Sequence, residues 1–333
     1  MIIVKYLGVL ITLLMLSACS TLSYYSQTAK GHLTLMAKRK PIKQVLQDTS
    51  VTEDRKKQLK LVQEILDFAH QRLKLPDNGS YEKYVELRRK AVTWNVIVTP
   101  KYSMTPSQWC FPVVGCISYK GYFSEKKALK EAKSLEALGY DVYVADATAY
   151  STLGWFKDPI VSTMLDHGII LTAETIFHEL AHQQVYHKND SEFNEAFATA
   201  VGQVGTRLWL KQKHPDSLKF YQEHLRKQRQ FIGLLLDTSK RLDKLYHIKM
   251  PDNETEKKKQ QIIQELRKRY AQLKQSWHGD NRYDAWFDKP INNARLALIG
   301  VYFEQIPKFV RLIEQGNYDF PKFYQKMKEK IVL

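Results

Sequence analysis

The feature that most constrains the fold is a stretch without proline or glycine, residues 171–186, which carries the spacing H-E-x-x-H through His178, Glu179 and His182. An uninterrupted stretch of this kind predicts a helix around the motif. Side chains four residues apart then lie on one helix face, with Cβ atoms about 5–6 Å apart, and Glu179 stands about 100° further round. The fold must therefore hold a helix that presents two imidazoles side by side.

Two imidazoles at this spacing can reach one Zn2+ ion at about 2.0–2.1 Å each. Glu179 can lean over the open position of that ion, where a carboxylate takes a proton from the activated water and returns it to the leaving amine. The motif therefore predicts a zinc hydrolase with His178 and His182 as ligands and Glu179 as general base. The alternative is an ordinary helix with two hydrogen-bonded histidines and a glutamate in an ion pair.

A third ligand is needed, because catalytic zinc sites use three protein groups and leave one position for water. The extended form of the motif continues with a glycine and a third histidine, but Val185 and Lys188 stand at those positions. His187 comes nine residues after His178, on the opposite side of a continuing helix, and is expected at the surface. A carboxylate is therefore the expected third ligand.

A second helix is predicted after a short polar break, with Asp190 or Ser191 as its N-cap. Glu195 lies one turn inside it among small and aromatic residues, and a lone carboxylate there is costly unless a cation meets it. Glu195 is therefore the predicted third ligand. Glu192, Glu174 and Asp190 remain as alternatives, although an acid such as Glu192 in the first turn is ordinarily a partner of the helix dipole.

The first residues have the form of a signal peptide, residues 1–18, in which Lys5 precedes an apolar stretch and then small residues. The stretch is too short for a stable spanning helix. It ends in Leu-Ser-Ala-Cys, which resembles the bacterial lipobox, so Cys19 is the predicted site of lipidation. Ser20 in place of aspartate favours the outer membrane, facing the periplasm, by analogy with known lipoproteins. An ordinary signal peptide and an uncleaved anchor are the alternatives.

The two remaining cysteines, Cys110 and Cys116, enclose a loop that contains proline and glycine. In an oxidising periplasm this spacing predicts a local disulfide. Two thiols do not complete a structural zinc site, and a redox pair more often has the spacing C-x-x-C. A pair of reduced, buried thiols is the alternative.

The mature chain, residues 19–333, is expected to form one α+β domain that is predominantly helical. Neither an internal repeat nor a second set of strands marks another domain. Residues 211–285 are rich in Lys and Arg and have helical periodicity, which predicts a basic helical hairpin inserted in the domain. The other expected elements are helices at 52–73 and 125–138 and strands at 94–98, 117–123 and 141–144.

The chain has 51 Lys and Arg against 35 Asp and Glu, a formal net charge of +16. Glutamate and glutamine interleave with the basic residues, as they do on solvated helix faces. A secreted chain seldom meets nucleic acid and no nucleic-acid motif is present, so no nucleic-acid partner is expected. Contact with anionic lipid headgroups or with the cell-wall polymer is the functional alternative.

The motifs together resemble the bacterial "predicted aminopeptidase" lipoprotein family, a branch of the zincin metallopeptidases with a glutamate as third ligand. The resemblance spans essentially the whole mature chain. It rests on the segments LSAC at 16–19, SYYSQ at 23–27, LPDNGSY at 75–81, WNV at 94–96, QWCFPVVGCISYKGYF at 108–123, GYDVYV at 139–144, AYSTLGWFKDP at 149–159, IFHELAHQ at 176–183, FNEAFATAVG at 193–202 and NNARLA at 292–297.

The resemblance implies a zincin-like zinc peptidase that acts on peptide substrates and carries an aminopeptidase label. Its ligands would be His178, His182 and Glu195, with Glu179 as general base. The G-x-M-E-N exopeptidase signature of the well-studied zinc aminopeptidases is absent. Thr199 stands where several peptidases of this kind place an aspartate that orients a ligand histidine.

Two further segments bear on catalysis. Residues 149–156 are either an edge strand that pairs with the peptide substrate or a loop that caps the cleft. Arg295 and Tyr302 are candidates for stabilising the oxyanion, although an ion pair or core packing explains them equally well. For the whole chain, the rival functions are a non-catalytic, metal-stabilised envelope scaffold or chaperone and a zinc-dependent cell-wall amidase.

Overall fold

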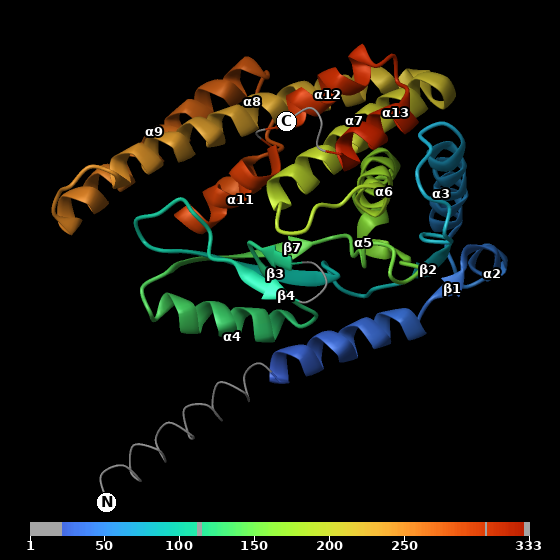
Figure 1. Cartoon of the computed structure of the whole chain (residues 1–333), viewed down its shortest axis with the longest axis horizontal. Coiled ribbons are helices and arrows are strands. Elements are labelled where there is room, and N and C mark those ends of the chain that lie inside the picture. The colour runs from blue at the N-terminus through green and yellow to red at the C-terminus, as the bar shows by residue number, and fades with distance from the viewer. Residues whose placement is uncertain (1–21, 112–114, 304, 330–333) are drawn as a thin grey trace, which may run out of the picture.

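The computed structural model describes residues 22–111, 115–303 and 305–329, and Figure 1 shows their arrangement. Helices predominate and the strands are short, which confirms the predominantly helical α+β class. After a first helical segment, the helices are α2 Ile42–Gln47, α3 Glu53–Gln71, α4 Glu125–Glu136, α5 Ser162–Leu165, α6 Ile169–Gln184, α7 Ser191–Lys213, α8 Pro215–Tyr246, α9 Asp252–Ser276, α10 Asp284–Phe287, α11 Asn293–Phe303, α12 Ile306–Gln315 and α13 Phe320–Lys328.

The main sheet has β3 (Thr93–Thr99) at its centre, antiparallel to both β6 (Lys120–Tyr122) and β7 (Asp141–Ala147). Alternate β3 side chains pack on α4 and form a hydrophobic cluster with it, as expected for a strand of period two. Figure 1 shows α4 on one side of this sheet and α11 on the other. The strands expected at 94–98 and 141–144 are confirmed.

The single strand expected at 117–123 is wrong, because Ser118 and Tyr119 leave the extended ladder. The residues before them form β5 (Gly115–Ile117), which pairs with β4 (Trp109–Phe111), and those after them form β6 in the main sheet. One run of β-forming residues is thus divided between two sheets. The turn between β5 and β6, residues 118 and 119, lines the cavity described below.

A second small sheet joins β1 (Lys40–Pro41), β2 (Lys83–Val85) and β8 (Ile160–Val161). Next to it lies the largest hydrophobic cluster, to which α3, α6, α7, α12 and α13 all contribute buried side chains. The helix expected at 52–73 is confirmed as α3, and the helix expected at 125–138 as α4, which ends just before Gly139 (φ +85°). Helices α6 and α7, which carry the predicted ligands, are therefore both part of this hydrophobic cluster.

The expected helical hairpin consists of α8 and α9, which pack against each other and extend to one side of Figure 1. They share a separate hydrophobic cluster that includes Leu235 and Leu266. The hairpin starts at Pro215 rather than at 211, because α7 continues to Lys213 and proline is favoured in the first turn of a new helix. The assignment of residues 19–333 to one domain stays a prediction.

Residues 22–37 are helical and lie against the main sheet. The Tyr24 ring centroid is 5.4 Å from that of Tyr122, and the Phe123 N–H donates to Gln27 Oε1 at 3.1 Å. Within the described ranges, the helices include none with the length and hydropathy needed to cross a bilayer. The predicted signal peptide 1–18 and Cys19 lie outside the described residues.

Candidate metal centre

The site lies between α6 and α7, which approach each other closely at Gly202. A Cβ on Gly202 would lie only 2.8 Å from the carbonyl oxygen of Glu174 on α6. At the start of α7, the Asp190 side chain accepts a hydrogen bond from the Phe193 N–H at 3.1 Å, the capping arrangement that the sequence predicts. The cap at Asp190 and the close approach at Gly202 thus set the position of α7. Its first turns face the H-E-x-x-H segment of α6.

The three predicted ligand residues converge in this interface. His178 Nε2 and His182 Nε2 are 3.0 Å apart, and Glu195 Oε2 lies 3.3 Å from the former and 3.7 Å from the latter. Among the described residues, this is the cluster of His, Cys, Asp and Glu side chains whose donor atoms all lie within 4.8 Å of one another. Donors about 2.0–2.1 Å from a tetrahedral ion stand about 3.3 Å apart. The observed distances bracket that value, so the residues present fit a zinc ion.

The electrostatics of the cluster keep the carboxyl group ionised. Burial raises the pKa of Glu195, but His182 and His178 act in the opposite sense through charge and hydrogen bonding, and the net effect is a pKa well below the usual range. Burial lowers the pKa of His178, and the hydrogen bond and charge of Glu195, with Glu179 and Glu174, more than offset this and raise it. An ionised carboxylate is the form that binds a divalent cation.

The other candidates for the third ligand lie elsewhere. Glu192 accepts a hydrogen bond from Gln305 Nε2 at 2.9 Å, and Asp190 caps α7. Glu174 lies one turn before His178 but is not part of the cluster. His187 is half-buried rather than on the surface as expected: its Nε2 lies 2.8 Å from the Met327 carbonyl oxygen. Helix α6 ends before Val185. The expected position of His187 was wrong because it assumed that the helix continues to that residue.

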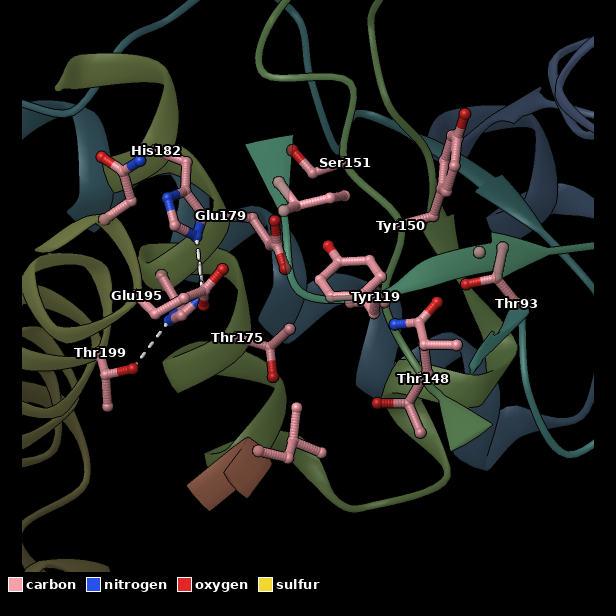
Figure 2. A pocket seen from close by; sticks show the side chains of 18 of the residues that line it. Thr93, Tyr119, Thr148, Tyr150, Ser151, Thr175, Glu179, His182, Glu195 and Thr199 are labelled. Carbon is pink, nitrogen blue, oxygen red and sulfur yellow. Dashed lines mark hydrogen bonds and ion pairs between the residues drawn. The ribbon is translucent and has the colours of Figure 1, made fainter. Parts of the chain in front are cut away.

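The cluster opens into a cavity of about 920 Å³ that Glu179 also lines. Figure 2 shows Glu179 beside His182 and Glu195. The Tyr119 hydroxyl is directed toward Glu179. Burial raises the pKa of Tyr119, and the negative charges of Glu195 and Glu179 raise it further, so the phenol keeps its proton. An acid outside the ligand set and a protonated phenol therefore share the cavity.

Tyr119 was missed by sequence reasoning. It sits in the turn between β5 and β6, and only the different pairing of those two strands brings that turn over the cluster. The sole sequence signal was its place within the segment 108–123 that carries the family resemblance.

Thr199 supports one of the imidazoles. Its Oγ1 lies 3.3 Å from His178 Nδ1, the ring nitrogen that faces away from the cluster. In contrast, His182 Nδ1 is buried and has no hydrogen-bond partner among the described residues. A hydroxyl therefore faces the outer nitrogen of His178, and it contacts only one of the two rings.

We expect Thr199→Val to weaken zinc binding about tenfold, because groups that orient a ligand histidine typically contribute 10- to 100-fold to metal affinity. Competition with a fluorescent zinc chelator would measure the change. Thr175→Val is the matched control, since its hydroxyl also lies at the cavity but donates to the Leu171 carbonyl at 2.9 Å. Equal affinities for both variants would contradict the orienting role.

The segment 149–156, for which a strand and a loop were both open, is a loop. Ala149, Tyr150 and Ser151 line the cavity. The loop is closed by Asp158, which is fully buried and accepts hydrogen bonds from Thr152 N and Thr152 Oγ1, both at 2.8 Å. Burial raises the pKa of Asp158 to about 6, although the Thr152 hydrogen bonds oppose the rise.

This buried carboxyl predicts a pH-dependent stability. The pKa in the folded state exceeds the ordinary value of 3.8, so the folded protein binds more protons than the unfolded chain between about pH 4 and 6. Asp158 therefore stabilises the fold less as pH rises through that window.

Asp158→Asn keeps an acceptor for Thr152 N without the charge. We therefore expect this variant to raise the free energy of unfolding by up to about 3 kcal/mol at pH 7.5 and to leave it unchanged at pH 4. Melting temperatures of both proteins across this range test it, and a difference that does not change with pH would count against it.

Arg295 and Tyr302 were the two oxyanion candidates. The Arg295 side chain is buried away from the cavity, with its guanidinium 4.1 Å from the Trp286 ring centroid and 5.2 Å from that of Tyr143. Arg295 is not among the described residues that line the cavity. The side chain of Tyr302 lies outside the described residues. The structure thus holds Arg295 away from the cluster, and the proposed role of Tyr302 stays a prediction.

The predicted disulfide is confirmed: Cys110 and Cys116 are bonded and face each other across β4 and β5. The Cys116 N–H donates to Asn189 Oδ1 at 2.9 Å, in the loop that joins α6 to α7. This hydrogen bond ties the hairpin that leads into Tyr119 to the loop between the two ligand-bearing helices.

Comparison with known proteins gives one family. A family model described as "Putative aminopeptidase" matches residues 23–332. No curated protein and no solved structure matches the chain. The match covers nearly all of the chain, including the three clustered residues and the cavity. The protein therefore belongs to the family described as "Putative aminopeptidase".

Proposed function

We propose that this protein is a zinc-dependent, zincin-like peptidase that removes residues from the N-terminus of peptides. The observation that carries the proposal is the convergence of His178 Nε2, His182 Nε2 and Glu195 Oε2 at separations of 3.0 to 3.7 Å. Two imidazoles and a carboxylate form a ligand set typical of catalytic zinc. The family supports peptidase activity, because its description names an aminopeptidase.

The chemistry follows from the residues around this ligand set. His178, His182 and Glu195 would hold the zinc ion, which would supply Lewis-acid polarisation of the water and of the scissile carbonyl. Glu179, which lines the cavity without belonging to the ligand set, takes the proton from the water and delivers it to the leaving amine. Tyr119 keeps its proton and donates a hydrogen bond to the carbonyl oxygen as negative charge develops on it.

The test combines metal analysis of the purified mature chain with digestion of a peptide library. We expect one zinc per chain, stepwise loss of N-terminal residues, and loss of activity after chelation that added zinc restores. Zinc without cleavage of any peptide would refute the peptidase and favour a metal-stabilised scaffold. Cleavage of cell-wall fragments in place of peptides would favour an amidase.

We also propose that Cys19 carries lipid and holds the enzyme at the outer membrane, facing the periplasm. The helical residues 22–37 support this location, because they follow Cys19 closely in the chain and pack on the main sheet, so a lipid on Cys19 would hold the body close to a bilayer. Labelling of cells with a palmitate analogue tests it. Label that persists after Cys19→Ser would contradict the assignment.

A further inference from the structure

The cavity beside the metal cluster has an acidic lining, although the whole chain is strongly basic. Its described lining residues include neither Lys nor Arg, whereas the chain as a whole has a formal net charge of +16. The acids that line it are Asp146, Glu174, Glu179 and Glu195. A cavity of this composition favours a cationic ligand.

Three of these four acids already have a partner or a proposed role. Glu195 belongs to the ligand cluster, Glu179 is the proposed general base, and Asp146 lies 3.4 Å from Lys90 Nζ. Glu174 differs, since no Lys or Arg in the described part of the chain forms an ion pair with it. Its Oε2 accepts a hydrogen bond from the Tyr221 hydroxyl at 2.6 Å. The Gln203 side chain also hydrogen-bonds to the carboxyl group, and burial raises the pKa of Glu174. A buried carboxylate whose partners are all neutral is costly unless a cation completes it.

Glu174 also has a defined position relative to the cluster. It precedes His178 by four residues on α6, so the two lie on one helix face. Both side chains flank the same point of α7, because a Cβ on Gly202 would lie 3.4 Å from Glu174 Cγ and 3.4 Å from His178 Cβ. The α7 backbone packs closely on α6 here, since the same Cβ would stand 2.8 Å from the Glu174 carbonyl oxygen.

This position suits the free amine of a peptide. In an N-terminal residue, the ammonium nitrogen is about 2.5 Å from the carbonyl carbon that is attacked. A group that binds the ammonium must therefore lie next to the metal ligands. Glu174 meets this requirement, because it lines the cavity beside the cluster without belonging to it.

We propose that the Glu174 carboxylate binds the α-ammonium group of the substrate's N-terminal residue, and that Tyr221 positions this carboxylate. The proposal rests on the peptidase function above and deepens it, because it identifies the substrates as peptides with an unblocked N-terminus. It also explains why an acidic side chain that is neither ligand nor base lines the cavity.

The test compares two matched substrates, an alanyl anilide and the propionyl anilide that lacks only the amino group. We expect the wild type to prefer the alanyl compound. In Glu174→Gln, kcat/KM for this compound falls about 10- to 100-fold, the range for a hydrogen bond to a charged group, while kcat/KM for the propionyl compound is unchanged. Tyr221→Phe gives a smaller loss in the same direction. Asp146→Asn, which changes another acid of the cavity lining, serves as the control and keeps the wild-type preference.

A binding measurement gives a readout apart from turnover. Leucine hydroxamate and its desamino analogue both chelate zinc and differ only in the amine. Calorimetry should show tighter binding of the leucine compound to the wild type and equal binding of both compounds to Glu174→Gln. If Glu174→Gln loses zinc or fails to fold, Glu174→Asp replaces it, because the shorter acid keeps the charge and should reduce the preference only in part.

The outcomes separate the two proposals. A wild type that binds zinc and cleaves neither anilide nor any peptide refutes the peptidase function itself. A wild type that cleaves both anilides equally leaves the peptidase standing and overturns the role of Glu174. A Glu174→Gln enzyme that keeps its preference for the free amine, or loses activity equally on both anilides, also overturns it.

Discussion

Glu179→Gln is expected to reduce peptide hydrolysis by about three orders of magnitude, the loss typical of a missing general base, while zinc content and melting temperature stay at the wild-type level. Glu179 lines the cavity, and the ligand cluster consists of His178, His182 and Glu195 without it. Glutamine has nearly the same shape but does not accept the proton of the attacking water. The activity should therefore fall through kcat rather than through metal binding.

Glu192→Gln is the matched control for this variant. It makes the same chemical change on α7, where Glu192 accepts a hydrogen bond from Gln305 and takes no part in the cluster. We expect wild-type kinetics from the control. Zinc content by elemental analysis and the pH dependence of kcat are measured for the wild type and both variants. Hydrolysis that survives in Glu179→Gln at more than about one tenth of the wild-type rate would remove Glu179 from the mechanism.

Glu195→Ala should abolish zinc-dependent stability as well as activity. The carboxylate is the one ligand that α7 supplies, and without it two histidines on a single helix are left to hold the ion. A ligand that binds only the folded state stabilises it by mass action, by about 4 kcal/mol when its free concentration is a thousand times Kd. We therefore expect a chelator to lower the melting temperature of the wild type and to leave that of Glu195→Ala unchanged.

The thermal measurement has its own control. Glu192→Ala, on the same helix but outside the cluster, should respond to the chelator as the wild type does. Metal titration of all three proteins then relates the thermal shift to zinc binding. If Glu195→Ala retained one zinc with wild-type affinity, another acid would hold the ion, and Glu174 on α6 would be the first to examine.

The convergence of His178, His182 and Glu195 could be predicted from the sequence because each inference used only neighbouring residues. His178 and His182 are one turn apart, and a helix without proline or glycine places them together whatever surrounds it. Glu195 could be identified because an acid among Phe193, Ala196 and Phe197 has few ways to be satisfied. The same local reasoning correctly predicted the disulfide and the helical hairpin, whose patterns also extend over a short stretch of chain.

The parts that reasoning missed depend on contacts between distant segments. Residues 117–123 have the composition of one strand. In the structure their first residue pairs with β4 in the Cys110–Cys116 hairpin, and their later residues pair with β3 in the main sheet. Arg295 had been a candidate for the oxyanion, and the rings of Trp286 and Tyr143 hold it elsewhere.

The sequence by itself thus determined which residues converge: helical periodicity places His178 and His182 on one face, and the cost of a lone carboxylate among apolar residues singles out Glu195. The tertiary structure alone decided what surrounds the cluster. The turn that carries Tyr119 and the absence of an ion-pair partner for Glu174 among the described residues arise from the packing of α6 against segments far away in the chain. The burial of Asp158, whose carboxyl group bonds within its own loop, likewise depends on what the fold packs over that loop. Such contacts form only when the chain folds as a whole, and no local pattern encodes them.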